Sequence, residues 1–123
     1  MIKTIYLILF TLLFCFLSGA NTSDVFVLHS YSSHYRYIND FNSSLLNLHT
    51  EALANSEYSY RFHFYYLDYN NLSESSQGLS EFILDKINYV NPFAIITFEL
   101  PAFYFIREYD TNISENVSLI SCG

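Results

Sequence analysis

The sequence has few of the residues on which several common kinds of protein depend. Its 123 residues include five lysine or arginine residues against twelve aspartate or glutamate residues, a formal charge of −7 at pH 7. A nucleic-acid-binding surface needs clustered basic side chains, so this composition argues against nucleic acid as a partner. The four histidines have no spacing that is typical of a metal site. We therefore expect neither a metal nor a cofactor.

Motifs of the common enzyme classes are missing too. The sequence contains neither a nucleophile elbow nor a phosphate-binding loop. Asp68 and Glu99 could share acid–base work, or His29 could activate Cys122, but neither pair has a confirming third group. We expect no catalytic residues and hence no enzyme in this chain, and keep a secreted enzyme as the third interpretation of its function.

The longest apolar run lies at the N-terminus. Lys3 precedes a run over residues 5–17, and small residues follow at Ser18-Gly19-Ala20. This pattern predicts a secretory signal peptide over residues 1–20, cut before Asn21. The alternative is an uncleaved membrane anchor through residues 5–17. Either way, we expect an exported, periplasmic or extracytoplasmic domain over residues 21–123.

Cleavage would also remove the first of the two cysteines. Cys122 would then stand alone, so no internal disulfide could form, and the remaining chain would have a formal charge of −8. We expect this part of the chain to be stabilised by an ordinary hydrophobic core.

Strand and helix patterns alternate along residues 21–123. Strands are predicted at residues 25–30, 58–67, 93–98 and 117–121, and helices at residues 38–54, 76–90 and 101–109. Alternating strands and helices imply parallel pairing through right-handed crossovers. We therefore predict an α/β fold, a doubly wound parallel sheet flanked by helices in three layers, with the strand order 2-1-3-4.

The apolar patterns also predict where each element lies. Val25–Leu28 and Phe93–Thr97 are nearly continuous apolar runs, as expected of adjacent inner strands buried on both faces. Residues 58–67 alternate with a period of two, which indicates a strand near the sheet edge. The first helix shows one apolar stripe with spacings of 3 and 4. Its members are Ile38, Phe41, Leu45, Leu48 and Ala52.

Polar and aromatic side chains follow the four strands. Because ligands bind at the carboxyl ends of the strands in open α/β sheets, we predict a site for a small polar or aromatic ligand there. The predicted ligand-binding residues are His29, Ser30, Tyr31, Tyr35, Tyr37, Asp68, Glu99 and Cys122.

Structural roles compete with this prediction at several of these positions. His29 could bond nearby backbone, the tyrosines could pack over the sheet edge, and Asp68 could cap the loop into the second helix. Glu99 is well placed to cap the helix that Pro101 opens, since a carboxylate there meets free amides. Cys122 could be a small buried residue.

The stretch VFVLHSYSSHYRYIND, residues 25–40, resembles the start of a bacterial family. The family comprises periplasmic-binding-protein-like domains related to ABC transporter substrate-binding proteins. Such domains also form the extracytoplasmic sensor part of histidine kinases and diguanylate cyclases. The matching residues are His29, Ser30, Tyr31 and Tyr35, with Tyr37 where the family usually has tryptophan.

Further similarities follow in order along the chain. Tyr66-Leu67-Asp68 matches the end of the second strand, residues 95–102 match the third strand and its exit, and Ser121-Cys122-Gly123 resembles the end of the fourth. Two features depart from the family pattern. Asn70 and Asn71 stand where a basic residue is common, and Glu99-Leu100 replaces a pair of aspartates.

The resemblance implies a partial first lobe of a type I periplasmic-binding-protein-like fold. We therefore expect a longer two-lobed protein, of which this chain alone would be poorly stable and would bind a ligand weakly or not at all. The implied function is a small-ligand-binding sensory domain of a bacterial signal-transduction protein. The alternative is a solute-binding protein of an ABC-type transporter, with a permease as its partner.

Overall fold

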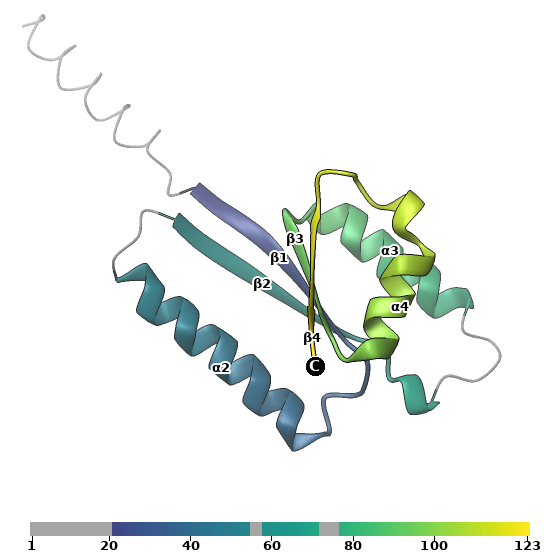
Figure 1. The fold of residues 1–123 in the computed structure, drawn as a ribbon, viewed down its shortest axis with the longest axis horizontal. Coiled ribbons are helices and arrows are strands. Elements are labelled where there is room, and N and C mark those ends of the chain that lie inside the picture. The colour runs from purple at the N-terminus through teal and green to yellow at the C-terminus, as the bar shows by residue number, and fades with distance from the viewer. Residues whose placement is uncertain (1–20, 55–57, 72–76) are drawn as a thin grey trace, which may run out of the picture.

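The computed structural model describes residues 21–54, 58–71 and 77–123 (Figure 1). The predicted signal peptide or anchor, residues 1–20, lies outside these ranges. The elements are β1 (Asn21–His29), α2 (Arg36–Leu53), β2 (Tyr58–Tyr66), the 3-10 turn η1 (Tyr69–Asn71), α3 (Gln77–Val90), β3 (Ala94–Phe98), α4 (Leu100–Glu108), the 3-10 turn η2 (Asp110–Asn112) and β4 (Ser118–Cys122). In the described part of the chain, no helix is long and apolar enough to cross a membrane.

The four strands form one parallel sheet in the order β2-β1-β3-β4. The predicted α/β class, the strand order and the inner positions of β1 and β3 are therefore confirmed. Helix α2 lies on one side of the sheet, and α3 and α4 lie on the other (Figure 1). Strand β1 begins earlier than its apolar run, because Asn21–Asp24 pair with Tyr58–Arg61 of β2.

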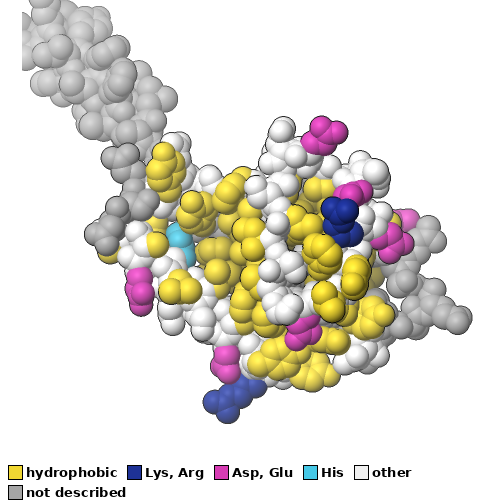
Figure 2. Space-filling view, viewed as in Figure 1, with side chains coloured by type: hydrophobic (Ala, Val, Ile, Leu, Met, Phe, Trp, Pro, Cys, Tyr) yellow, Lys and Arg dark blue, Asp and Glu magenta, His cyan; other side chains and the backbone are white. Residues whose placement is uncertain are grey.

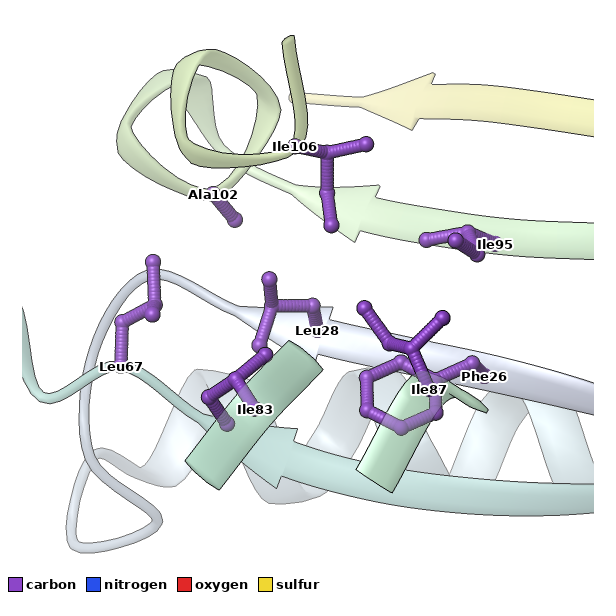
Figure 3. Close-up of a cluster of buried hydrophobic side chains, with 8 residues drawn as sticks. All are labelled: Phe26, Leu28, Leu67, Ile83, Ile87, Ile95, Ala102 and Ile106. Carbon is purple, nitrogen blue, oxygen red and sulfur yellow. The ribbon is translucent and has the colours of Figure 1, made fainter. Parts of the chain in front are cut away.

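The main core lies between the sheet and the pair α3 and α4 (Figure 3). Alternate residues of a strand point to opposite faces, so a continuous apolar run supplies both. Phe26 and Leu28 of β1 and Ile95 of β3 face this core, where Ile83 of α3 and Ile106 of α4 meet them. All five side chains are at most 3% exposed.

Helix α2 buries only part of the predicted stripe: Ile38 is buried and Phe41 and Leu45 are partly buried, but the later residues of the stripe are exposed. Leu48, for example, is 64% exposed. Asn42 is buried, and the ring of His49 packs edge-on against Phe62 at 5.4 Å. The buried face is therefore turned towards these polar positions. The reason is that Asn42 finds a buried partner under the helix, as described below.

An ion pair links β1 and β2 near the amino end of the sheet. The Asp24 carboxylate accepts hydrogen bonds from the Arg61 guanidinium at 2.6 and 3.1 Å and from His63 Nε2 at 2.7 Å. These bonds hold the pKa of Asp24 at about 2, below its usual 3.8. Because the folded state favours the ionised carboxylate, the stability gained is present above pH 3.8 and lost as the pH falls towards 2.

Hydrophobic side chains also remain at the surface. Phe93 and Ile120 are 48% and 46% exposed, and the ring of Tyr60 stacks on Phe93 at 5.6 Å. Figure 2 shows hydrophobic side chains gathered over the middle of the face in view, with the charged groups towards its margins. Ile120 lies on the last strand, β4, whose outer edge has no strand beside it within the described ranges.

Candidate ligand site at the carboxyl edge of the sheet

The four strand exits lie side by side at one edge of the sheet. Backbone hydrogen bonds join each exit to the next: Leu67 N donates to His29 O at 2.8 Å, and Ser30 N donates to Phe98 O at 3.2 Å. Glu99 N donates to Cys122 O at 2.8 Å. The pairing of the sheet thus continues into the exits, and this places the predicted site residues of all four strands along one edge.

His29, at the end of β1, lies beneath this edge and is fully buried. Its imidazole is packed among aromatic rings, stacked on Tyr66 at 5.2 Å and edge-on to Phe98 at 5.4 Å and Phe41 at 5.7 Å. Among the described residues, no backbone group bonds the ring, and its Nδ1 has no hydrogen-bond partner. Instead, Nε2 bonds Asn42 Oδ1 at 2.7 Å, so the ring joins β1 to α2 through a side chain.

Asn42 completes a buried polar link that the sequence did not reveal. Its Nδ2 donates to the Tyr66 hydroxyl at 3.2 Å, so Asn42 connects β1, α2 and β2. The one signal that could have identified it is its position four residues after Ile38, on the same side of the helix. Burial lowers the pKa of His29 below its usual 6.5, and the bond to Asn42 opposes this shift. The imidazole therefore favours the neutral form, with Nε2 donating to Asn42.

Ser30 is also buried, and its hydroxyl is used twice. Oγ donates to Phe98 O at 2.9 Å and accepts from Ala102 N at 2.9 Å. Ala102 lies in the first turn of α4, whose amides have no partner within the helix. A hydroxyl from the β1 exit therefore caps α4. Ser30 thus positions the loop after β3 against the exit of β1.

The tyrosines lie at the surface above His29. Ring centroids are 6.1 Å apart for Tyr31 and Tyr35, 5.7 Å for Tyr35 and Tyr37, and 6.3 Å for Tyr37 and Phe98. Tyr35 and Tyr37 are each 43% exposed. The Tyr35 hydroxyl accepts a hydrogen bond from Asn70 Nδ2 at 3.2 Å, which ties the exit loop of β2 to that of β1.

Glu99 does not form the helix cap that its position predicts. It stands at the N-cap of α4 but makes no side-chain capping bond, because Ser30 fills that role. Its negative charge instead acts on the nearby Tyr37. The pKa of Tyr37 is raised, first by burial and then by the negative charge and hydrogen bonding of Glu99. We call Tyr31, Tyr35, Tyr37, Phe98 and Glu99 the edge cluster.

The backbone at Glu99 has an unusual conformation. Its φ is 70° and its ψ 161°, a region populated almost only by glycine. Holding another residue there costs about 1–3 kcal/mol. Such strain is concentrated at functional sites, where the surrounding structure fixes it. The backbone conformation of Glu99 is therefore a second reason, besides its carboxylate, to look for a functional site at this strand exit.

Asp68 and Cys122 complete the predicted set at its two ends. Asp68 follows β2, is partly buried and has a φ of 50°. Cys122 ends β4 and is partly buried, with its thiol free. His29 and Cys122 both pair with Phe98 from opposite sides, so they are two strand spacings, about 10 Å, apart. The His29 ring is bonded to Asn42 on α2, and no hydrogen bond joins it to the thiol within the described ranges.

Two grooves among the described residues are not lined by the edge cluster. One, of about 530 Å³, lies between α3 and α4 and is lined in part by Leu67, Leu100 and Tyr104. The other, of about 550 Å³, is lined in part by Ile113 and Val117, which precede β4. In the ranges 21–54, 58–71 and 77–123, no group of three or more His, Cys, Asp or Glu side chains could hold a metal ion.

These contacts define the candidate site by its geometry. No family model, curated protein or solved structure matches the chain. The resemblance of residues 25–40 to periplasmic-binding-protein-like domains therefore remains a prediction, and so does ligand binding by each of the eight predicted residues. The structure places His29 and Ser30 in the floor of the site, and Tyr35 and Tyr37 at its surface.

Proposed function

We propose that this chain is an extracytoplasmic small-ligand-binding domain of a bacterial signal-transduction protein, part of the first lobe of a periplasmic-binding-protein-like fold. The observation that carries the proposal is the edge cluster itself. Exposed rings of Tyr35 and Tyr37 and the carboxylate of Glu99 lie at the carboxyl edge of a parallel sheet, where α/β folds bind ligands.

The floor of the site supports a binding role. His29 and Ser30 are buried and hold α2 and α4 to the end of β1 through side-chain hydrogen bonds. A rigid floor lowers the entropic cost of ordering the surface rings around a ligand. These two residues therefore position the edge cluster, whose members would contact the ligand.

The binding surface can be tested by substitution. Tyr31→Ala and Asp68→Ala should weaken binding of a small ligand, because both residues lie at strand exits, whereas His63→Ala should not, because His63 lies within β2 and bonds Asp24. The measurement is an NMR titration of the chain with separate pools of amino acids, amines, sugars, nucleosides and organic acids. If no pool perturbs the residues of the strand exits, either in this chain or in a longer two-lobed protein that contains it, the proposed function has to be dropped.

The cellular location can be tested separately. We expect the exported product to begin at Asn21, because Ser18 and Ala20 form a small-residue cleavage site. Mass spectrometry of the periplasmic and membrane fractions reads this N-terminus directly. An intact N-terminus in the membrane fraction would contradict cleavage and would favour the anchored sensor over a transport protein. A product found only in the cytoplasm would contradict export altogether.

A further inference from the structure

The aromatic rings of the edge cluster are tilted or edge-on to one another and are not stacked in parallel. The interplanar angles are 69° between Tyr31 and Tyr35, 38° between Tyr35 and Tyr37, and 47° between Tyr37 and Phe98. Rings at such angles do not stack into a closed column. Phe98 also stacks on Phe41 at 4.3 Å, which covers one of its faces, whereas Tyr35 and Tyr37 are each 43% exposed. The face of each ring is electronegative and attracts cations within about 6 Å of its centre.

The charge beside these rings has the same sign as their faces. Glu99 directly follows Phe98, its negative charge helps to raise the pKa of Tyr37, and no basic side chain of the described ranges forms an ion pair with it. The basic residue nearest in sequence to the rings is Arg36, between Tyr35 and Tyr37. Its side chain is 94% exposed and is directed to Asp40 at 3.9 Å. The Arg36 guanidinium therefore does not neutralise the charge of Glu99.

This combination selects among ligand classes. An anion would be repelled by Glu99 and by the ring faces, and a neutral ligand could donate a hydrogen bond to the carboxylate but would gain no charge attraction from it. A compact cation gains from both. The unusual backbone of Glu99 fits this interpretation, because glycine would occupy that conformation freely but would supply no charge.

We propose that the edge cluster binds the ammonium group of a small organic cation, with the rings of Tyr35, Tyr37 and Phe98 around it and Glu99 as its counter-charge. The inference rests on the proposed function and names its ligand class. Tyr31 extends the ring surface towards the remainder of the ligand.

Choline and its neutral isostere 3,3-dimethyl-1-butanol test the role of charge. The two molecules have the same shape, but only choline carries a positive charge. In NMR titrations of the chain at millimolar concentrations, choline should shift the resonances of Tyr35, Tyr37 and Glu99, and the isostere should shift them far less. Equal shifts by both molecules, or none by choline, would overturn the inference.

Two variants of Glu99 isolate the carboxylate. Glu99→Gln should weaken choline binding about two- to fivefold and leave the isostere unaffected. Glu99→Gly should do the same while remaining folded, since glycine tolerates the backbone at this position. Tyr89→Leu is the matched control, because Tyr89 lies on α3 and is 87% exposed. If both Glu99 variants bind choline as the parent does, Glu99 is not the counter-charge of the bound cation.

The outcome also separates this inference from the proposed function. If a pool without cations perturbs the strand exits and choline does not, the domain binds ligands and the cation inference is wrong. If neither choline nor any pool perturbs them, either in this chain or in the longer protein, both proposals fail.

Discussion

Phe26→Ala should lower the free energy of unfolding by about 3–5 kcal/mol, the usual cost of removing a buried aromatic ring. Phe26 is fully buried on β1, and its ring stacks on Tyr65 at 4.7 Å. Ile83 and Ile87 of α3 pack in the same cluster, so the cavity would open where three elements meet (Figure 3). Urea unfolding followed by circular dichroism measures the change.

Phe82→Ala is the matched control for this experiment. Phe82 lies on α3 and is 48% exposed, so the same truncation should cost less than about 1 kcal/mol. The two expected losses differ by about 2 kcal/mol or more, so the two variants should be clearly separable. Equal losses would mean that the interface between β1 and α3 is not the principal core.

His29 should make the domain less stable as the pH falls below 6.5. Burial lowers the pKa of the folded imidazole, so the unfolded state binds the proton more readily. The stability that this difference provides is full above pH 6.5 and is lost as the pH falls towards the lowered pKa. For one proton the slope can reach about 1.4 kcal/mol per pH unit. Urea unfolding at pH 7.5, 6.5 and 5.5 should show it.

His29→Phe tests the assignment, because it keeps an aromatic ring in the cluster but removes the titrating group. The variant should be less stable than the parent at pH 7.5, since Asn42 loses its partner at 2.7 Å, but its stability should vary less with pH. His34→Gln, in the exposed loop after β1, should retain the parent's slope. If the stability of His29→Phe falls with pH as steeply as that of the parent, another group causes the loss of stability at low pH.

The arrangement of the sheet could be predicted because it depends on patterns within single segments. Continuous apolar runs in residues 25–28 and 93–97 mark strands covered on both faces, and the alternation in residues 58–67 marks an edge strand. Right-handed crossovers then leave few possible orders. The element boundaries agreed less well, because β1 extends through a polar stretch that pairs with β2.

The details of the site depend on partners that are distant in sequence. Asn42 is a polar residue within a helix, and only its contacts with His29 and Tyr66 show why α2 turns this face to the sheet. The cap of α4 comes from Ser30, 72 residues before Ala102, so the neighbouring Glu99 was the natural but wrong choice. Spacing along the chain predicts which residues reach the carboxyl edge, but it does not predict which of them are buried there.

The central position of β1 has a consequence for how the chain folds. Its two neighbours are synthesised long after it: Asp24 and Arg61 are 37 residues apart, and Ser30 and Phe98 are 68 residues apart. Parallel pairing over such separations is slow, because long loops must close before the contacts form. At about 5–20 residues per second, the ribosome needs roughly 3–14 s to supply β3 after β1. During this interval Val25–Leu28 is an unprotected apolar segment of the kind that chaperones bind.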